Sequence, residues 1–552
     1  MKSKSFFLWA MVSVIIAMGA IHPLLSYANK LEGDTLILVG VKLNGTTLTD
    51  SLYMRITSGG NQVEARKFMQ LLGGTFCPFS HVFHQNGFMT QYGRYISFTG
   101  LGFDQGMVNL QLIKMVPPAV NRFVNGDSVY FAPLAFLAET LDGSVTFDAI
   151  QQLMEITCAP PPVFGDVFPP AAPVANALQG SGYIVQQGDI NKENPIEFCL
   201  AGYTPNANGN NADFPYFGIQ FPPYPGSDSI FTPPMNFTFQ ENEAMVYIGL
   251  TPPECKYYSY RSYLMNRFYE FPYPRRIKIN ASLGETTSMY RMRPDLPLDS
   301  MFGRKFALIM SADSLVAMQI KQTILAATPE IAEADIHFDI LPAEIFYLGL
   351  QPQSDWGNFL CRAVLFADSA AQQAYMNNVP VEIMRVTPDP STPQVPFSLH
   401  PFLPRACGTT EFALLPDMAL LEEAIFDAYQ TDYEMIMLLS WPFNMEGFTA
   451  IQLGQDAAGD NHDALYITTS DFQFRDNDRI LTYGVNHFMT GKAEYTNIDI
   501  YGKKYLNGFG GISNLMLAKS ARQFISDTTI ADNLYAWTFT RHPIPGNPYI
   551  YL

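Results

Sequence analysis

Basic residues are scarce in this sequence of 552 residues: 33 Lys or Arg stand against 51 Asp or Glu, a net charge of −18 at pH 7. Nucleic acids and anionic membrane surfaces attract proteins through basic patches, so we expect neither as a partner. After its N-terminal segment the sequence also lacks any run of about 18 apolar residues, the length that a membrane-spanning helix needs. We therefore expect no transmembrane span once that segment is cleaved.

Sequence motifs for catalysis are missing as well. There is no HExxH, GxSxG or Walker motif, so the sequence gives no direct sign of a zinc protease, an α/β-hydrolase or a P-loop enzyme. No CxxC occurs, which leaves a thioredoxin-like redox role without support. In an oxidising compartment the six cysteines permit three disulfides, and free buried thiols are the alternative. The cysteines are Cys77, Cys158, Cys199, Cys255, Cys361 and Cys407.

The first 28 residues have the pattern of a secretory signal peptide. Lys2 and Lys4 supply positive charge, Phe6–Ile21 is apolar, and Ser26–Ala28 gives a small-x-small cleavage site. We expect the mature chain to begin at Asn29 and to be secreted, either extracellular or in the cell envelope. The alternative is an uncleaved segment that anchors the chain.

Proline divides the mature chain. Residues 159–175 contain six prolines, so we expect this run to join neither a helix nor a central strand and to act as a semi-rigid linker. It separates a small module, residues 29–158, from a large one, residues 176–552. The large module forms either a single unit or two subdomains, about 176–387 and 405–552. Strand and helix patterns occur in both modules, so the expected fold class is mixed α/β or α+β.

In the small module, Leu36–Leu43 is strand-like and Asn44-Gly45 predicts a hairpin turn. Gln62–Leu72 and a segment opened by Pro133 predict helices, because apolar residues recur at helical spacing and glycine follows each. The remaining expected strands are 92–99, 107–116, 145–147 and 153–157.

The end of this module carries a family resemblance. Asn125–Leu141 runs from an Asn-Gly turn through a strand and Pro-Leu into a helix, followed by Val145–Asp148 and Met154–Ile156. The pattern resembles the copper amine oxidase N-terminal-like domain and covers roughly 120 residues. The chain departs from it at Ala135, where the family usually has Arg, and at Phe147, where it usually has Trp.

The resemblance implies a stalk-like domain of exported bacterial proteins that binds no copper and does no chemistry. A true copper amine oxidase forms its cofactor from a Tyr in an Asn-Tyr-Asp/Glu context and uses His-x-His among its copper ligands. This sequence contains neither an Asn-Tyr dipeptide nor His-x-His. Amine oxidase activity is therefore rejected, and no cofactor is expected.

Cys77, His81 and His84 form the closest approach to a metal motif in this module. Thiolate and imidazole are good ligands for zinc or copper, but a fourth ligand is missing. The alternative is a loop with Cys77 in a disulfide and two solvated histidines.

The large module predicts alternating strands and helices. Apolar runs predict its strands, one of them the buried strand Met435–Leu439, and Asp368 is an expected helix N-cap. The expected strands are 245–250, 306–310, 336–340, 361–366, 381–386, 435–439, 464–468 and 480–484, and the expected helices are 313–327, 369–376 and 416–429.

Lys256–Arg276 contains six tyrosines and four arginines. Tyrosine faces and planar guanidinium groups suit a sugar- or anion-binding surface. The residues that we assign to such a surface are Tyr257, Tyr260, Arg261, Tyr263 and Arg267. In the alternative, the tyrosines pack inside the protein and the arginines neutralise nearby acids.

Two histidine-bearing loops near the C-terminus are the candidate catalytic site. His462 and Asp463 precede an expected strand, and Asn486 and His487 follow another. With Asp456 and Asp460 nearby, histidine can act as a base and carboxylates as orienting groups or metal ligands. The alternative is that each histidine is a hydrogen-bonded structural residue.

We therefore expect an exported cell-envelope or surface protein in which a stalk positions an aromatic-rich module. That module would bind an extracellular ligand or a cell-wall polysaccharide. The competing hypothesis is an extracellular hydrolase acting on a sugar, ester or peptide. A structural component of a surface layer is a third.

Overall fold

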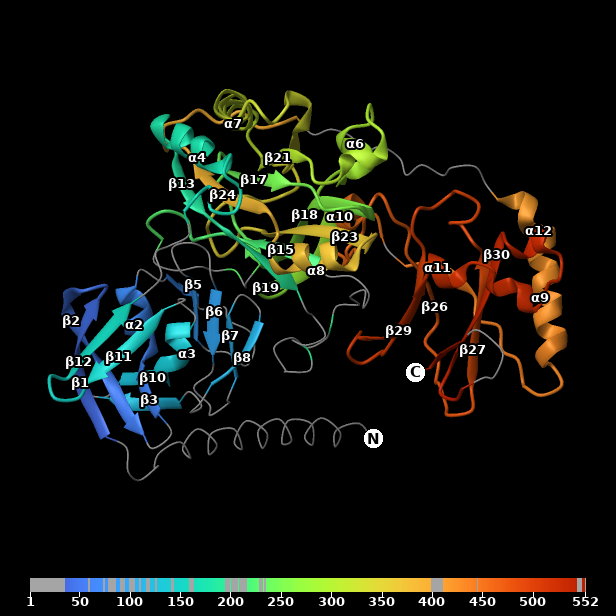
Figure 1. Ribbon diagram of the computed structural model, residues 1–552, viewed down its shortest axis with the longest axis horizontal. Helices are drawn as coiled ribbons and strands as arrows, with labels where there is room; N and C mark the ends of the chain where they lie inside the picture. The colour runs from blue at the N-terminus through green and yellow to red at the C-terminus, as the bar shows by residue number, and fades with distance from the viewer. Residues whose placement is uncertain are drawn as a thin grey trace, which may run out of the picture. The chain divides into compact units, whose positions relative to one another are not determined.

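The computed structural model describes the chain from Thr35 to Tyr551 except for short ranges. The residues left out are 1–34, 58–59, 73–74, 78–85, 90–94, 99–104, 109–110, 116–119, 125–126, 140–142, 158–162, 194–198, 200–206, 208–215, 228–231, 233–234, 399–410, 444, 544–548 and 552. The chain divides into two compact units, residues 1–161 with 226–233 and residues 162–225 with 234–552. It contains helices together with mixed sheets, which confirms the mixed α+β class (Figure 1). No helix in the described ranges has the length and apolar character needed to cross a membrane.

The first unit is built on a seven-stranded sheet with the order β11-β12-β1-β2-β3-β10-β9. β1 (Thr35–Leu43) and β2 (Thr46–Thr57) form the expected hairpin. Its turn suits Asn44 and Gly45, because their φ angles are positive, 46° and 84°. The other strands are β3 (Gly60–Glu64), β9 (Val120–Val124), β10 (Asp127–Pro133), β11 (Ser144–Asp148) and β12 (Leu153–Thr157), and β12 runs parallel to β1.

Two short helices, α2 (Ala65–Leu71) and α3 (Leu134–Glu139), bury apolar side chains in the core of this sheet. The helix expected from Gln62 begins at Ala65, because Gln62 and Val63 pair with β2 and β10 as part of β3. Long-range strand pairing overrides local helix propensity there.

A five-stranded antiparallel meander completes the first unit. Its strands are β4 (Thr75–Cys77), β5 (Asn86–Met89), β6 (Tyr95–Phe98), β7 (Gln105–Val108) and β8 (Gln111–Lys114). The single strand expected over residues 107–116 is wrong, because the chain turns back within it to form the β7–β8 hairpin.

The second unit contains two large sheets. Sheet I has the order β13-β24-β17-β21-β22, and sheet II has the order β14-β15-β23-β18-β19 with β16 and β20 attached to it. Sheet I consists of β13 (Ile184–Gln187), β17 (Ala244–Leu250), β21 (Lys305–Ser311), β22 (Ile336–Ile340) and β24 (Val381–Thr387). Sheet II consists of β14 (Asp189–Glu193), β15 (Tyr216–Gln220), β16 (Asn236–Phe237), β18 (Cys255–Tyr269), β19 (Arg275–Ser282), β20 (Thr287–Ser288) and β23 (Trp356–Phe366).

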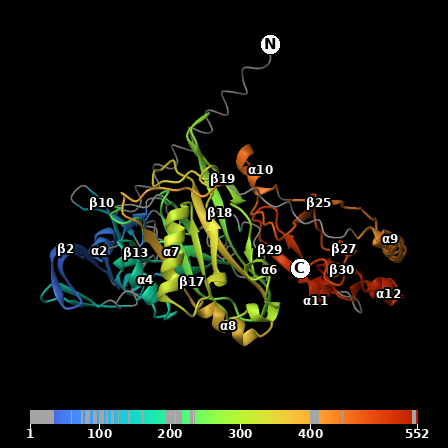
Figure 2. The ribbon, with the colours of Figure 1, turned by 90° about the horizontal axis from the view of Figure 1, so that it is seen from above.

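The alternation of side chains along β17 shows how the layers pack. Ala244, Val246 and Ile248 share a core with helices α4 (Ala171–Gly180) and α7 (Ser314–Ala327), which lie side by side on one face of sheet I (Figures 1 and 2). Met245 and Tyr247 point the opposite way, into a core shared with sheet II. Two helices of this region have aspartate N-caps: Asp313 caps α7, and Asp368 caps α8 (Ser369–Asn377) as expected.

The linker expected over residues 159–175 is partly wrong. Its last five residues are the first half of α4, in which Pro173 lies in the first turn. The first backbone N–H groups of a helix have no partner within the helix, so proline is tolerated there. Phe168 and Val174 are buried against sheet I, and the backbone N–H of Phe168 donates to Glu382 Oε1 at 3.0 Å.

The C-terminal part of the second unit is built from short elements. Its strands are β25 (Ser440–Pro442), β26 (Ile467–Thr469), β27 (Arg479–Val485), β28 (Asn497–Tyr501), β29 (Gly508–Ser513), β30 (Leu534–Thr540) and β31 (Tyr549–Tyr551). Its helices are α9 (Leu415–Tyr429), α10 (Gly447–Leu453), α11 (Asn514–Leu517) and α12 (Thr528–Ala531), and α6 (Met289–Met292) lies earlier in the chain. The buried strand expected over Met435–Leu439 is wrong: this run is irregular, and Ile436 and Leu439 are 78% and 74% exposed.

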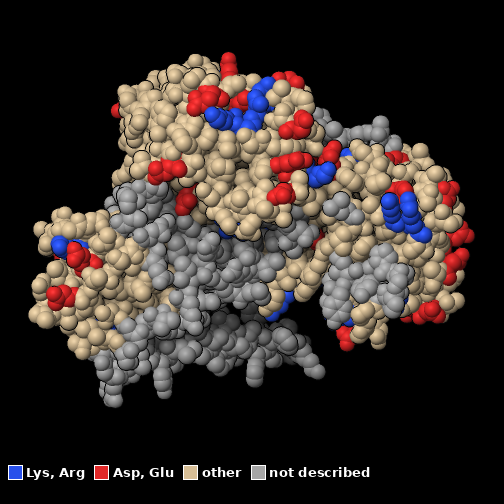
Figure 3. All heavy atoms as spheres, in the orientation of Figure 1, with Lys and Arg blue, Asp and Glu red and all other residues tan. Residues whose placement is uncertain are grey.

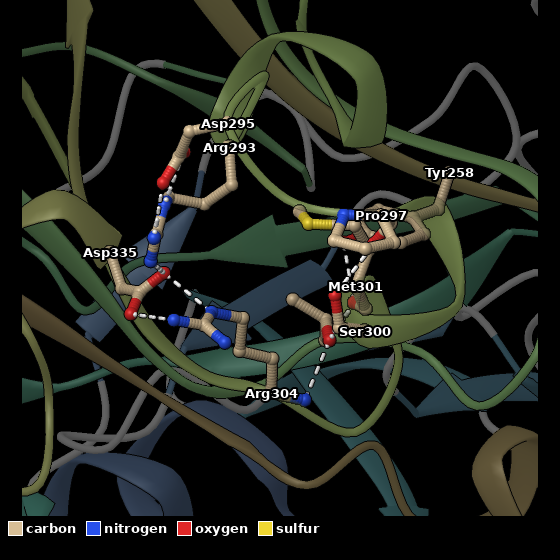
Figure 4. Close-up of polar contacts among 9 residues, drawn as sticks. Tyr258, Arg293, Asp295, Pro297, Ser300, Met301, Arg304 and Asp335 are labelled. Carbon is tan, nitrogen blue, oxygen red and sulfur yellow. Dashed lines mark hydrogen bonds and ion pairs between the residues drawn. The ribbon is translucent and has the colours of Figure 1, made fainter.

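A buried ionic cluster lies beside β22 (Figure 4). Asp335 accepts hydrogen bonds from Arg304 Nε and Nη2, both at 2.6 Å, and its Oδ1 lies 3.1 Å from Arg293 Nη1. Two residues further on, burial lowers the pKa of His337 to about 4, and its Nε2 is buried without a hydrogen-bond partner. The folded protein therefore holds this imidazole uncharged.

His337 makes stability depend on pH. Because the pKa of His337 is lower in the folded chain than in the unfolded chain, its contribution is complete above about pH 6.5 and is lost as the pH falls towards 4. At pH 5 the loss is about 2 kcal/mol. In urea titrations the free energy of unfolding of the wild type is expected to fall by about 2 kcal/mol more between pH 7 and pH 5 than that of a His337→Gln variant. The same change at exposed His542 is the control, and an equal effect of both variants would contradict the assignment.

Candidate functional site

The loop Asp460–Asp463 is held in place by the buried carboxylate of Asp460. Its Oδ1 accepts from the Ser282 backbone N–H at 2.8 Å, and its Oδ2 accepts from Ser282 Oγ at 2.7 Å and from the Gly447 backbone N–H at 2.9 Å. These bonds join the loop to the end of β19 and the start of α10. Burial raises the pKa of the Asp460 carboxyl above its usual value, and the hydrogen bonds from Ser282 oppose the shift.

His462 lies between two carboxylates. Its Nδ1 is 3.3 Å from Glu285 Oε1, and its Nε2 is 3.2 Å from Glu446 Oε2. The imidazole is 6% exposed, whereas the Glu446 side chain is 48% exposed. One ligand atom each from Glu446, Asp460 and His462 lie within 4.8 Å of one another. Such a group can transfer a proton or hold a cation.

The neighbouring residues of the loop are also engaged. Asn461 Oδ1 accepts from Thr286 Oγ1 at 2.7 Å and from the Asp463 backbone N–H at 3.0 Å. Asp463 Oδ2 accepts from Tyr257 Oη at 3.0 Å, and its Oδ1 lies 3.6 Å from Arg291 Nη2. The structure thus brings Tyr257, assigned from sequence to a ligand surface, next to Asp463, assigned to catalysis.

The second histidine loop has different partners. His487 Nδ1 lies 2.6 Å from Glu411 Oε2, which is also 3.6 Å from Lys492 Nζ. Asn486 is fully buried; its N–H donates to the Asn533 carbonyl at 2.8 Å and its Oδ1 accepts from the Met489 N–H at 3.3 Å. The two expected catalytic histidines therefore take their carboxylates from different segments, and Asn486 has a structural role.

Most of the expected Tyr/Arg binding surface lies inside the protein. Tyr260 and Tyr263 on β18 are buried. Arg261 Nη1 donates to Asp339 Oδ1 at 2.8 Å, and Arg267 Nη2 donates to Asp355 Oδ2 at 2.6 Å. Their burial places these four side chains in the packing alternative and corrects their assignment to a surface. Residues 258–264 of β18 are all buried, so both side-chain faces of the strand are covered there.

Two of the described thiols are poor nucleophiles. Cys199, Cys255 and Cys361 are free, and burial raises the pKa of Cys255 and of Cys361 to about 12, so both stay protonated. The candidate metal residues His81 and His84, together with Cys158, Cys407 and the side chain of Cys77, lie outside what the structure describes.

A surface that the sequence reasoning missed lies on β25 and β26. Trp441 on β25 and Phe443, the residue after the strand, are two positions apart and point to the same face. Tyr466 lies opposite Phe443 and shares that face; its carbonyl accepts from the Phe443 N–H at 2.9 Å. Trp441 and Phe443 are 46% and 57% exposed. We call Trp441, Phe443 and Tyr466 the aromatic face. The other exposed apolar side chains close to it in sequence are Met435, Ile436, Met437, Leu439, Leu465 and Ile467.

The stretch of sequence around the aromatic face carries charge of one sign, and Lys278, Arg291, Lys492 and Lys503 from other segments pair with four of its acids. Residues 406–474 contain 12 Asp or Glu and no Lys or Arg, so they contribute −12 of the net charge of −18. Figure 3 shows acidic side chains along the edge of the molecule where α9 lies. The absence of Lys and Arg from residues 406–474 is a feature of the sequence that could have pointed to this surface. By contrast, nothing local in the sequence pointed to Glu285 or Glu446 as partners of His462.

Comparison of the chain with protein-family models, with curated proteins and with solved structures found no match. The resemblance of residues 29–158 to the copper amine oxidase N-terminal-like domain therefore stays a prediction, and the function is argued from the geometry alone.

Proposed function

We propose that the chain is an exported cell-envelope or surface protein whose small module acts as a stalk and whose large module binds another protein. The partner contact is made by the aromatic face and the exposed apolar run before it. The observation that carries the proposal is the combination of exposed apolar side chains with purely acidic charge in residues 406–474. The partner that fits is a basic amphipathic protein segment.

The apolar side chains supply the attraction at short range. Burying one large apolar side chain contributes roughly 1.5–3 kcal/mol of favourable free energy. At each exposed position this gain becomes available only when a partner covers the side chain. Ile436, Leu439 and Phe443 are all more than half exposed. Contiguous apolar surface of this kind marks interaction sites on soluble proteins, and methionines such as Met435 and Met437 adapt to varied partners.

The acidic residues select the partner's charge. Residues 406–474 hold twelve carboxylates and no Lys or Arg of their own; Asp460 is buried, and four others pair with Lys or Arg from other segments. The negative charge that is left repels an anionic lipid surface and attracts a basic segment, and salt weakens that attraction. An amphipathic segment with apolar residues on one face and Lys or Arg on the other satisfies both features.

A defined peptide tests this proposal. A synthetic amphipathic peptide of leucine and lysine is expected to bind the full chain, while a peptide of the same pattern with glutamate in place of lysine is not. Trp441→Ser combined with Phe443→Ser is expected to weaken binding at least tenfold, with an unchanged unfolding midpoint because both side chains are exposed. Fluorescence anisotropy measures the affinity.

Ile150→Ser is the matched control, because Ile150 is 95% exposed but lies in the first unit, away from residues 406–474 in sequence. It is expected to leave peptide binding unchanged. Equal binding of the lysine and glutamate peptides, or equal losses in both variants, would sink the proposal.

An extracellular hydrolase remains the second candidate, and the contact that favours it is His462 between Glu285 and Glu446. A carboxylate on Nδ1 can orient an imidazole as a general base. We rank the hydrolase second to the binding proposal, because the two residues expected to join His462 in catalysis have other partners. His487 pairs with Glu411, and Asn486 accepts from the Met489 N–H.

A further inference from the structure

We propose that Glu446, Asp460 and His462 form a binding site for a zinc ion. The inference does not use the aromatic face, and it shares with the proposed function only the carboxylates of Glu446 and Asp460. Ligand atoms of the three side chains lie within 4.8 Å of one another. They come from both ends of one short stretch: Glu446 directly precedes α10, and Asp460 and His462 lie in the loop that follows it.

The imidazole of His462 has a carboxylate at each nitrogen: Glu285 Oε1 lies 3.3 Å from Nδ1, and Glu446 Oε2 lies 3.2 Å from Nε2. In the tautomer that donates its Nδ1–H to Glu285, Nε2 offers a lone pair that a metal ion can bind together with the Glu446 carboxylate.

One pair of ligand atoms has the spacing that zinc requires. Zinc binds nitrogen and oxygen at about 2.0–2.2 Å, so two ligands at a tetrahedral angle lie about 3.3 Å apart. His462 Nε2 and Glu446 Oε2 are 3.2 Å apart. One imidazole and two carboxylates favour a borderline ion such as Zn²⁺ over Ca²⁺ or Mg²⁺, which prefer oxygen ligands alone.

The surroundings match the outer shell of a metal site. A metal-binding histidine usually donates its second N–H to a carboxylate, which fixes the tautomer. Glu285 is placed for this role at Nδ1, and Glu285 is itself paired with Arg291. Asp460 is oriented by its hydrogen bonds from Ser282 and Gly447. The exposed Glu446 carboxylate lets an ion enter from solvent.

Titration calorimetry of the full chain, stripped with EDTA and titrated with ZnCl₂, tests the site. Glu446→Gln is expected to remove one bound Zn²⁺ per chain or to weaken it at least tenfold, and Glu285→Gln to weaken it about 10–100-fold. Because Glu446 is half exposed, its variant should fold, and circular dichroism checks this. The difference in bound Zn²⁺ between the wild type and Glu446→Gln measures this site alone, because zinc bound elsewhere in the chain contributes equally to both.

Asp456→Asn is the matched control, since Asp456 is a half-exposed carboxylate of the same loop region whose partner is Lys278. It is expected to leave Zn²⁺ binding unchanged. Equal stoichiometry and affinity in the wild type and Glu446→Gln would overturn the site. So would an equal loss in Asp456→Asn, which would mean that zinc follows acidic charge in general.

Discussion

Replacing Arg385 by methionine is expected to lower the free energy of unfolding by about 3–5 kcal/mol. Arg385 on β24 forms a two-point contact with Glu243, which directly precedes β17: Nε donates to Oε1 at 2.8 Å and Nη2 donates to Oε2 at 2.7 Å. Both side chains are buried. The loss is large because the substitution leaves the Glu243 carboxylate buried without its counter-charge.

A second ion pair with the same geometry but greater exposure separates the effect of burial from that of charge. Arg522 and Asp532 make the same two-point contact, with both distances 2.6 Å, but both side chains are partly exposed. Arg522→Met is expected to change the unfolding midpoint little, because water already screens that pair. Urea unfolding of the two variants gives the comparison, and equal destabilisation would contradict the role given to burial.

The second large effect is expected at Asp460. Asp460→Ala leaves Ser282 and the Gly447 N–H without their buried acceptor, and each unsatisfied buried group costs about 1–3 kcal/mol. We therefore expect a loss of about 3 kcal/mol or more in unfolding free energy. Faster hydrogen exchange at the Ser282 and Gly447 amides is expected too, because the loop then detaches from β19 and α10.

Asp456→Ala is the control for this variant. Asp456 lies four residues earlier, and its ion pair with Lys278 spans 3.4 Å at a half-exposed position. Its removal is expected to leave both exchange rates unchanged. If Asp456→Ala matched Asp460→Ala, the buried hydrogen bonds would not be what holds the loop.

Elements with strong local signals were predictable from sequence. The helix over residues 314–327 has apolar side chains at helical spacing, and an aspartate precedes it, which caps it by accepting from the Val316 N–H at 2.8 Å. Leu153–Thr157 forms β12 with the expected bounds. In both cases the residues that signal the conformation lie within the element or directly before it.

The predictions that failed depended on distant partners. Met435–Leu439 has the composition of a buried strand, but the structure leaves most of the run exposed and unpaired with a sheet, which composition does not encode. Lys256–Arg276 was ambiguous because tyrosine and arginine serve surfaces and cores alike. The acids that bury its arginines, Asp339 and Asp355, come much later in the chain.

The candidate site was predictable in part for the same reason. His462 and Asp460 are close together in sequence, and their spacing predicted a loop that combines a histidine with carboxylates. Glu285 comes from a segment far earlier in the chain, and long-range bonds such as those from Asp460 to Ser282 and from Thr286 to Asn461 bring that segment next to His462.

Hydrogen–deuterium exchange of the full chain, with and without the leucine–lysine peptide, tests whether the aromatic face binds a basic amphipathic segment. We expect peptide binding to slow exchange in residues 435–443 and 465–469, around the aromatic face, and to leave β18, which is already buried, unchanged. Protection confined to other segments, or none at saturating peptide, would contradict it.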